Sequence, residues 1–413
     1  MQCITFFPKN LYFSGKVATF VAKMKTTREF LSRAVLILTG VVFGVFLSSC
    51  NVETDNPSVP TTPDDVPTPE PEPQDETVAL TFEAAEAGAV VKFLHCTTSA
   101  APEHVEVSTD GGSTWTALTS DGVTLAHVGD KVSFRGQNAA YGSEVDGWHS
   151  FDLSRRCYVY GNIMSLIDKD HYATLKNLSA DYTFSNLFKD QSNLLTKDDK
   201  KLLLPAETLT GHCYYYMFQG CSSLTVAPEL PATELTESCY CGMFYICSNL
   251  TVAPELPAME LKENCYDEMF FGCQKLAAAP ALPAMSLADK CYAHMFEYCL
   301  AFVEAPELPA TELKKGCYQC MFKSCFNLTV APVLHAKTLV KKCYWGIFED
   351  CQSLASVTCL ALSKQATEEN ELTFWLYGAG SEVPAGTNKT LYTSSSSTID
   401  WDTDKEGFTV VPL

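Results

Sequence analysis

A repeat of fixed length limits the folds open to this chain more than any other feature of its sequence. One cysteine recurs every 26 residues from Cys213 to Cys343, and a second recurs with the same spacing from Cys221 to Cys351. The unit reads C-Y-x-x-M-F-x-x-C-x-x-L-x-x-A-P-x-L-P-A-x-x-L-x-x-x, and residues 183–209 hold a degenerate, longer copy. One unit has about ten apolar positions and cannot enclose them, so copies must stack side by side to build a core.

Two local patterns predict the secondary structure of the unit. In Cys-Tyr-x-x-Met-Phe-x-x-Cys the cysteines and the methionine lie at i, i+4 and i+8, which predicts a helix with all three on one side. Residues 224–231 are expected to be extended, because each proline disfavours helical geometry in the residue before it. The period and the recurrent leucines predict a mixed α/β repeat, a leucine-rich-repeat solenoid of about six to seven coils at residues 157–363.

The repeat columns Cys-Tyr-x-x-Met-Phe-x-x-Cys-x-x-Leu resemble those of BspA-like, treponemal-type leucine-rich-repeat surface lipoproteins of Gram-negative anaerobes. Their unit reads I-G-x-x-A-F-x-x-C-x-x-L, and residues 157–166 resemble the junction that such proteins place before the repeats. The unit of this chain is about three residues longer, with an added Ala-Pro-x-Leu-Pro segment. The resemblance implies a cell-surface protein that binds host or microbial partners without catalysis.

Residues 1–49 are interpreted as an upstream extension and a lipoprotein signal peptide. A basic stretch precedes an apolar run at 34–46, which is too short to span a bilayer. Leu47-Ser48-Ser49-Cys50 resembles a bacterial lipobox, in which Cys50 would receive lipid; the alternative is an ordinary signal peptide with a chance cysteine. Residues 50–77 form an acidic, proline-rich tether. We therefore expect an outer-membrane location, through a lipid anchor, with exposure at the cell surface.

Two further domains are predicted beside the repeats. Residues 78–156 contain short alternating stretches separated by Gly-Asp turns, which indicate a small all-β, sandwich-like domain. Within it, residues 108–115 match the Asp-box pattern S-x-D-x-G-x-T-W of sialidase propellers. Because the box occurs once, we interpret Asp110 as a turn-forming residue rather than a catalytic one. Trp375 and Trp401 suggest that residues 364–413 cap the last coil.

The repeated cysteines allow three interpretations. Zinc ligands usually come in closely spaced pairs, whereas these pairs are eight residues apart, and Cys317-x-x-Cys320 occurs in one unit only. Disulfides between coils are permitted in an exported protein, but stacked identical residues point in parallel rather than toward each other. We therefore favour buried free thiols in the two repeated columns, whereas Cys241 and Cys320 occupy variable positions at which a thiol could be exposed. No metal and no cofactor are predicted.

A candidate binding strip comes from the variable positions of the unit. The two residues after Cys-Tyr and the two after Met-Phe change between copies, and such positions line up across a stack. They include acids such as Asp267, Glu268, Glu297, Glu349 and Asp350. Exposed aromatic rings suit sugars or apolar patches of a protein partner; alternatively, they lie over neighbouring coils and stabilise them. The candidate ligand-binding residues are Tyr215, Tyr216, Tyr245, Phe271, Tyr298 and Trp345.

Composition and missing motifs narrow the function. A formal net charge of −20 argues against binding to nucleic acid. The chain has no H-E-x-x-H, G-x-S-x-G or P-loop sequence. We therefore expect a non-enzymatic adhesion or binding protein whose partner is a host or microbial surface protein or glycan. One alternative is a carbohydrate-processing surface lipoprotein, but a sialidase-like enzyme should carry several Asp boxes and a cluster of arginines, whereas this chain has one box and few arginines. The other alternative is a structural surface spacer.

Overall fold

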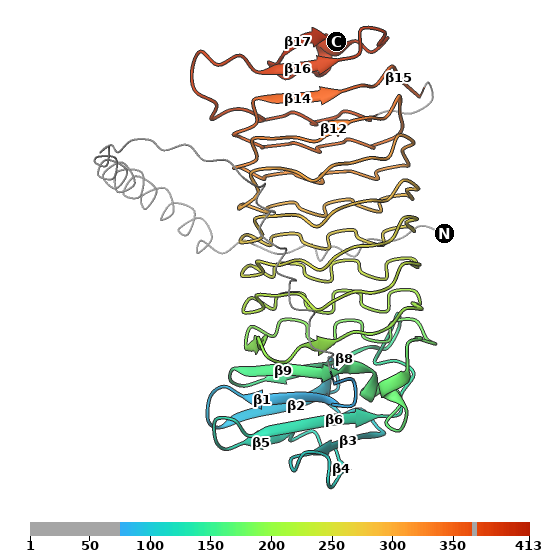
Figure 1. Cartoon of the computed structure of the whole chain (residues 1–413), viewed down its shortest axis with the longest axis vertical. Coiled ribbons are helices and arrows are strands. Elements are labelled where there is room, and N and C mark those ends of the chain that lie inside the picture. Colours follow the sequence, from blue (N-terminus) through green and yellow to red (C-terminus); the bar gives the residue numbers. More distant parts are fainter. Residues whose placement is uncertain (1–74, 366–369) are drawn as a thin grey trace, which may run out of the picture. The chain divides into compact units, whose positions relative to one another are not determined.

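The computed structural model describes residues 75–365 and 370–413; the predicted signal segment and Cys50 lie outside them. Within the described part, a region of β-strands comes first, and coils of similar outline then stack on it in chain order (Figure 1).

Two sheets pack against each other in the first region. A seven-stranded sheet has the order β10-β9-β1-β6-β3-β4, with β11 also paired to β9, and a four-stranded sheet has the order β5-β2-β8-β7. Phenylalanine rings fill the space between them: the ring of Phe151 on β8 lies 4.7 Å from that of Phe82 on β1 and 5.0 Å from that of Phe134 on β6. The strands are β1 (Leu80–Ala84), β2 (Ala89–His95), β3 (Val105–Ser108), β4 (Thr116–Ala117), β5 (Val123–Leu125), β6 (Lys131–Gly136), β7 (Gly142–Ser143), β8 (Gly147–Leu153) and β9 (Cys157–Asn162).

Strand β9 joins this region to the coils that follow. It pairs antiparallel with β1 and parallel with β10 (Leu194–Leu195) and β11 (Leu202–Leu203), which belong to the first coil. Two short 3-10 helices, η2 (Ile163–Leu166) and η3 (Tyr172–Thr174), come between.

The coils are held together by backbone hydrogen bonds that alternate in direction. The N–H groups of Tyr214 and Tyr216 donate to the carbonyls of Cys239 and Cys241 in the next coil, at 3.0 and 2.9 Å. The residue between them, Tyr215, donates instead to the carbonyl three positions earlier, at 3.2 Å. Each coil therefore closes its own turns with every second amide and bonds to its neighbour with the others.

Every fourth residue of this segment has left-handed backbone geometry. In one coil the φ angles are 56° at His212, 49° at Tyr216 and 72° at Gly220, and the same columns repeat in the following coils. Side chains therefore come in pairs, two inward and two outward, so that Cys213, Tyr214, Met217 and Phe218 are all buried while the intervening pairs face outward.

The predicted fold class, a mixed α/β leucine-rich-repeat solenoid, is therefore wrong. The described residues contain only one α-helix, α2 (Trp401–Asp404), and it lies beyond the repeats. The Cys-Tyr-x-x-Met-Phe-x-x-Cys segments are four-residue turns, whose inward positions recur at i, i+4 and i+8 just as one side of a helix does. The proline-containing segments form isolated bridges such as Val226 with Val252, because proline lacks the donor that a longer ladder needs. The described structure is almost entirely strand and turn, with several small sheets.

Two columns of aromatic rings run through the core of the stack. The tyrosines from Tyr214 to Tyr344 are stacked with centroids 5.6–6.1 Å apart, and the phenylalanines from Phe218 to Phe348 with centroids 5.5–5.9 Å apart. The planes in both columns are within 14° of parallel. Identical rings in identical columns thus fill the space between coils.

The C-terminal segment continues the stack and then adds strands. The N–H of Phe348 donates to the carbonyl of Trp375 at 3.0 Å, so residues 371–378 form a further coil, with buried Trp375 in the methionine column. The Trp375 and Trp401 rings lie 5.9 Å apart. A four-stranded sheet of order β12-β14-β16-β17 and a β13-β15 pair complete this end. Their bounds are β12 (Val333–Leu334), β13 (Thr338–Leu339), β14 (Ser356–Cys359), β15 (Ser363–Lys364), β16 (Thr390–Thr393) and β17 (Thr409–Pro412).

The inward face can be tested in the middle of the stack. Phe270 is fully buried between Phe244 and Phe296, so Phe270→Ala is expected to lower the free energy of unfolding by about 3–5 kcal/mol. The transition should also broaden in chemical denaturation, because a stack interrupted at one coil unfolds less cooperatively. Phe271→Ala, the neighbouring outward position, is the control; an equal loss in both variants would contradict the assignment of inward and outward pairs.

The left-handed turn geometry predicts an unusual sign for a glycine substitution. Lys290 is exposed with φ of 53°, and glycine occupies the same column at Gly316. Lys290→Gly should therefore raise the free energy of unfolding by about 0.5–1 kcal/mol. The relief of left-handed backbone strain outweighs the additional conformational entropy that glycine gives to the unfolded chain. Thermal melting would measure it, with Lys290→Ala as the control for loss of the side chain. In a helix the order would reverse, since glycine costs about 1 kcal/mol relative to alanine there.

Candidate binding face

The six candidate aromatic residues lie on the outward pairs of the turns. Tyr298 is 41% exposed, and the other five are partly buried. Their backbone positions follow from the alternation of inward and outward pairs, so that each coil presents its outward pair directly beside that of the next.

Four of these rings form one continuous row across successive coils. Centroid distances are 5.7 Å from Tyr216 to Tyr245, 4.6 Å from Tyr245 to Phe271 and 5.7 Å from Phe271 to Tyr298. Tyr215 joins the row at its start, with its ring 4.5 Å from that of Tyr216. The rings thus lean on one another while keeping part of their surface in solvent. We call these five residues the aromatic row.

Trp345 is not part of the aromatic row. Its ring lies 6.2 Å from that of Phe374 in the following coil, and Lys342 lies over it at 5.4 Å. The structure therefore brings together five of the six predicted aromatic residues and places the sixth in a separate group.

Polar side chains occupy outward positions beside the aromatic row and between it and Trp345. The Tyr216 hydroxyl donates a hydrogen bond to Glu268, and Lys323 forms a 3.0 Å ion pair with Glu349. His294 Nδ1 lies 2.6 Å from an oxygen of Glu297. Burial alone would lower the pKa of His294, but the hydrogen bond and charge of Glu297 outweigh it and raise that pKa.

Asp267 is the least satisfied acid on this face. One of its carboxylate oxygens is buried without a hydrogen-bond partner. Burial, together with the charge of Glu268, raises the pKa of Asp267 to about 7. The row of rings therefore borders a partly desolvated, acidic patch.

Asp110 has the structural role predicted for it. Its carboxylate accepts hydrogen bonds from the Thr114 hydroxyl at 2.6 Å, the Thr114 amide at 2.9 Å and the Ser108 hydroxyl at 2.8 Å, and these lower its pKa to about 2. Gly111 and Gly112 supply φ angles of 74° and 90° at the turn. These hydrogen bonds to the Asp110 carboxylate all lie within one loop, so its role is to shape the turn.

The prediction of free thiols is confirmed for the described cysteines, which form no disulfide, but Cys241 and Cys320 are buried rather than exposed. In the second cysteine column each thiol donates to a phenylalanine carbonyl of the previous coil, as from Cys273 to Phe244 at 3.2 Å. Burial raises the pKa of the thiols in both columns, so these groups stay protonated. They act as packing and hydrogen-bonding groups of the core.

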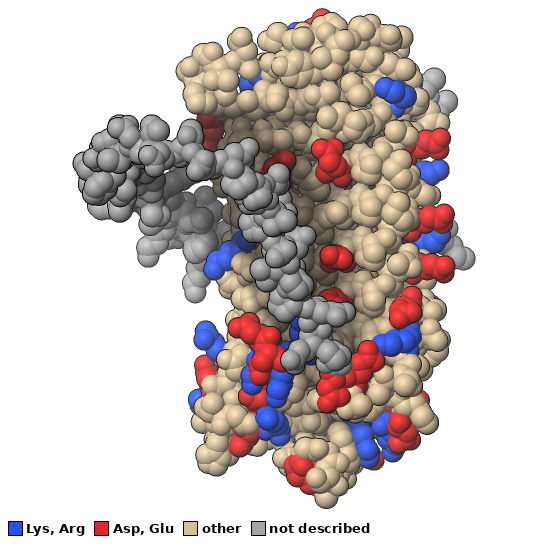
Figure 2. Space-filling model, in the orientation of Figure 1, with Lys and Arg blue, Asp and Glu red and all other residues tan. Residues whose placement is uncertain are grey.

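A hollow lies where the β-strand region meets the first coil. It has a volume of about 960 Å³, and Trp115, Arg135 and Lys201 are among its lining residues. Arg135 stacks over Trp115 at 4.2 Å and pairs with Glu106 at 2.7 Å, while Lys201 pairs with Glu229 at 2.7 Å. Charged side chains of both signs gather over this region (Figure 2). Because these cations already have carboxylate partners, the hollow is the weaker candidate.

Comparisons with protein families, with curated proteins and with solved structures find no match for this chain. In the described ranges, no helix has the length and apolar character needed to cross a membrane.

Sequence reasoning missed one group of side chains on this face. His294 and Cys320 occupy the same column of consecutive coils, and Glu297 lies three residues after His294. Reading the repeat by columns rather than along the chain would have placed the histidine beside the cysteine, because residues 26 apart stack on each other.

Proposed function

We propose that this chain is a surface-anchored, non-catalytic binding protein that contacts a host or microbial protein or glycan through the outer side of its turns. The observation that carries the proposal is the continuous row of rings from Tyr216 through Tyr245 and Phe271 to Tyr298. Partly exposed aromatic rings in a row suit sugar rings and the anchor residues of protein partners.

The backbone of the coils supports this proposal. Outward side chains are held at spacings set by the amide bonds between coils, so a partner would meet a face that is already ordered. Preordered side chains lose less conformational entropy on binding than side chains on a loose loop.

The carbohydrate-processing alternative loses its main support, because Asp110 is committed to its own turn. The spacer alternative predicts that the rings serve only to stabilise the stack, and the first experiment below distinguishes it from binding. The lipid anchor at Cys50, and with it the outer-membrane location, rests on the sequence alone.

The binding proposal predicts that Tyr216→Ser, Tyr245→Ser and Phe271→Ser together lower the affinity for a ligand, identified by glycan or protein array, by at least about tenfold. Surface plasmon resonance would measure the affinity, and thermal melting the stability. A matched control replaces the exposed valines Val226, Val252 and Val330 by serine. Retained binding with a lowered melting temperature would show that the rings only stabilise the stack and would contradict binding through the aromatic row, whereas the spacer alternative predicts that the arrays yield no ligand.

The anchor proposal predicts that a palmitate analogue labels the protein in growing cells and that Cys50→Ala removes the label. Cys96→Ser, at an exposed cysteine of the folded region, is the control and should leave the label unchanged. Equal labelling of the wild type and Cys50→Ala would exclude lipid attachment at this residue.

A further inference from the structure

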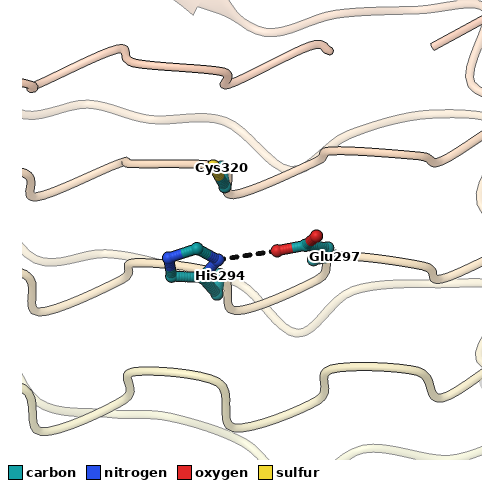
Figure 3. Close-up of side chains that lie close together, drawn as sticks. All are labelled: His294, Glu297 and Cys320. Atoms are coloured by element: carbon teal, nitrogen blue, oxygen red, sulfur yellow. Dashed lines mark hydrogen bonds and ion pairs between the residues drawn. The ribbon is translucent and has the colours of Figure 1, made fainter. Parts of the chain in front are cut away.

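The group missed by sequence reasoning has the composition of a metal site. One ligand atom from each of His294, Glu297 and Cys320 lies within 4.8 Å of the other two. Figure 3 shows the imidazole and the carboxylate facing each other along one coil, with Cys320 on the next coil beside the histidine. We propose that these three residues bind a transition-metal ion of the zinc class.

The backbone fixes the relative positions of the three residues. His294 and Glu297 are outward positions of consecutive pairs in one coil, and the His294 N–H donates to the carbonyl of Gln319 at 2.7 Å, directly before Cys320. His294 and Cys320 both have left-handed φ angles, 55° and 52°. The site is therefore built on the amide bonds between coils rather than on a loop.

The distances suit a bound ion after small side-chain movements. Bonds of about 2.0–2.3 Å to a tetrahedral zinc ion place ligand atoms about 3.3–3.8 Å apart. The three ligand atoms lie within 4.8 Å of one another, so an ion fits once the hydrogen bond of 2.6 Å between His294 and Glu297 lengthens and the sulfur takes up bonding distance.

Burial and charge favour a cation at this position. Glu297 is 7% exposed and Cys320 1% exposed, and a buried carboxylate needs a positive or hydrogen-bonding partner. Asp267 adds a second carboxylate that interacts with His294, and one of its oxygens lacks a partner. The two positive charges of a divalent ion would replace the proton held between His294 and Glu297 and the thiol proton, so the site would take up the ion without a change in net charge.

The donor set selects the class of metal. Imidazole nitrogen, carboxylate oxygen and thiolate sulfur together suit zinc and similar ions, whereas calcium and magnesium prefer oxygen alone. On binding, the ion displaces two protons to solvent: the thiol proton, because the thiolate is the ligand, and the proton held between His294 and Glu297. Gly346 of the following coil leaves room beside the sulfur, since a Cβ there would lie 3.0 Å from Cys320 Sγ. Three protein ligands leave a fourth position for water or a partner's side chain.

Neighbouring coils lack this combination. The equivalent positions hold Glu268, Phe271 and His294 one coil earlier, and Cys320, Lys323 and Gly346 one coil later. The proposed site is therefore a property of one place in the stack, and it lies between the aromatic row and the group around Trp345.

Cobalt(II) titration of the metal-stripped full chain tests the proposal. We expect one equivalent of cobalt to give a sulfur-to-metal charge-transfer band with visible ligand-field bands, and zinc to displace it. Cys320→Ser should abolish the charge-transfer band. His294→Gln should weaken cobalt binding by more than about tenfold, because replacing a residue that only supports a metal ligand already weakens binding by about that factor. Zinc should also raise the melting temperature of the wild type and not of Cys320→Ser.

The controls are Cys96→Ser, at an exposed thiol beside His95, and His212→Gln, at a histidine outside the group. Both should bind cobalt as the wild type does, and circular dichroism should give all four variants the wild-type spectrum. A wild type without a charge-transfer band overturns the proposal, as does a band that survives Cys320→Ser or disappears in Cys96→Ser.

Discussion

The structure depends on one arrangement of backbone amides. Along each series of turns, one N–H group closes a turn within its own coil and the following N–H group donates to a carbonyl of the next coil. The amide donors of the turns therefore find partners without a helix or a long strand. This arrangement requires a left-handed residue at every fourth position, and glycine fills only some of those positions. Isolated non-glycine residues in this region are strained by about 1–2 kcal/mol each, so burial of the rings and thiols has to compensate for many such sites.

Much of the structure was predictable from the pattern of apolar residues. The strands near Phe82, Phe93 and Phe134, the burial of Met269 and Phe270, and the free state of the repeated thiols all follow from alternation, recurrence and geometry. The predicted helix was wrong because a spacing of four is shared by a helix and by a series of four-residue turns. The residues that distinguish the two carry positive φ, and side chains as different as Tyr216, Asn264 and Lys342 occupy those positions. Residue type therefore concealed the left-handed geometry.

The outer face of the turns was predictable only in part. The variable positions were correctly expected to line up, because any stack with a fixed period brings equivalent residues together. The row from Tyr216 to Tyr298 and the isolation of Trp345 depend on ring orientation, which no spacing encodes. The group of His294, Glu297 and Cys320 depends on the alignment of columns and on side-chain orientation, since its members come from two coils and from three outward pairs.

The uniform period of the coils has a consequence for how such a chain can change length. Each coil meets its neighbours through amide bonds and rings in fixed columns, so deleting or duplicating a block of 26 residues would rejoin equivalent surfaces on either side of the cut. A single inserted residue that is not absorbed where it enters would instead move one residue of every later inward pair to the outside of its coil. Recombination between copies therefore preserves the packing only when it adds or removes whole units. Such events could lengthen or shorten the outer face while leaving the two ends of the stack intact.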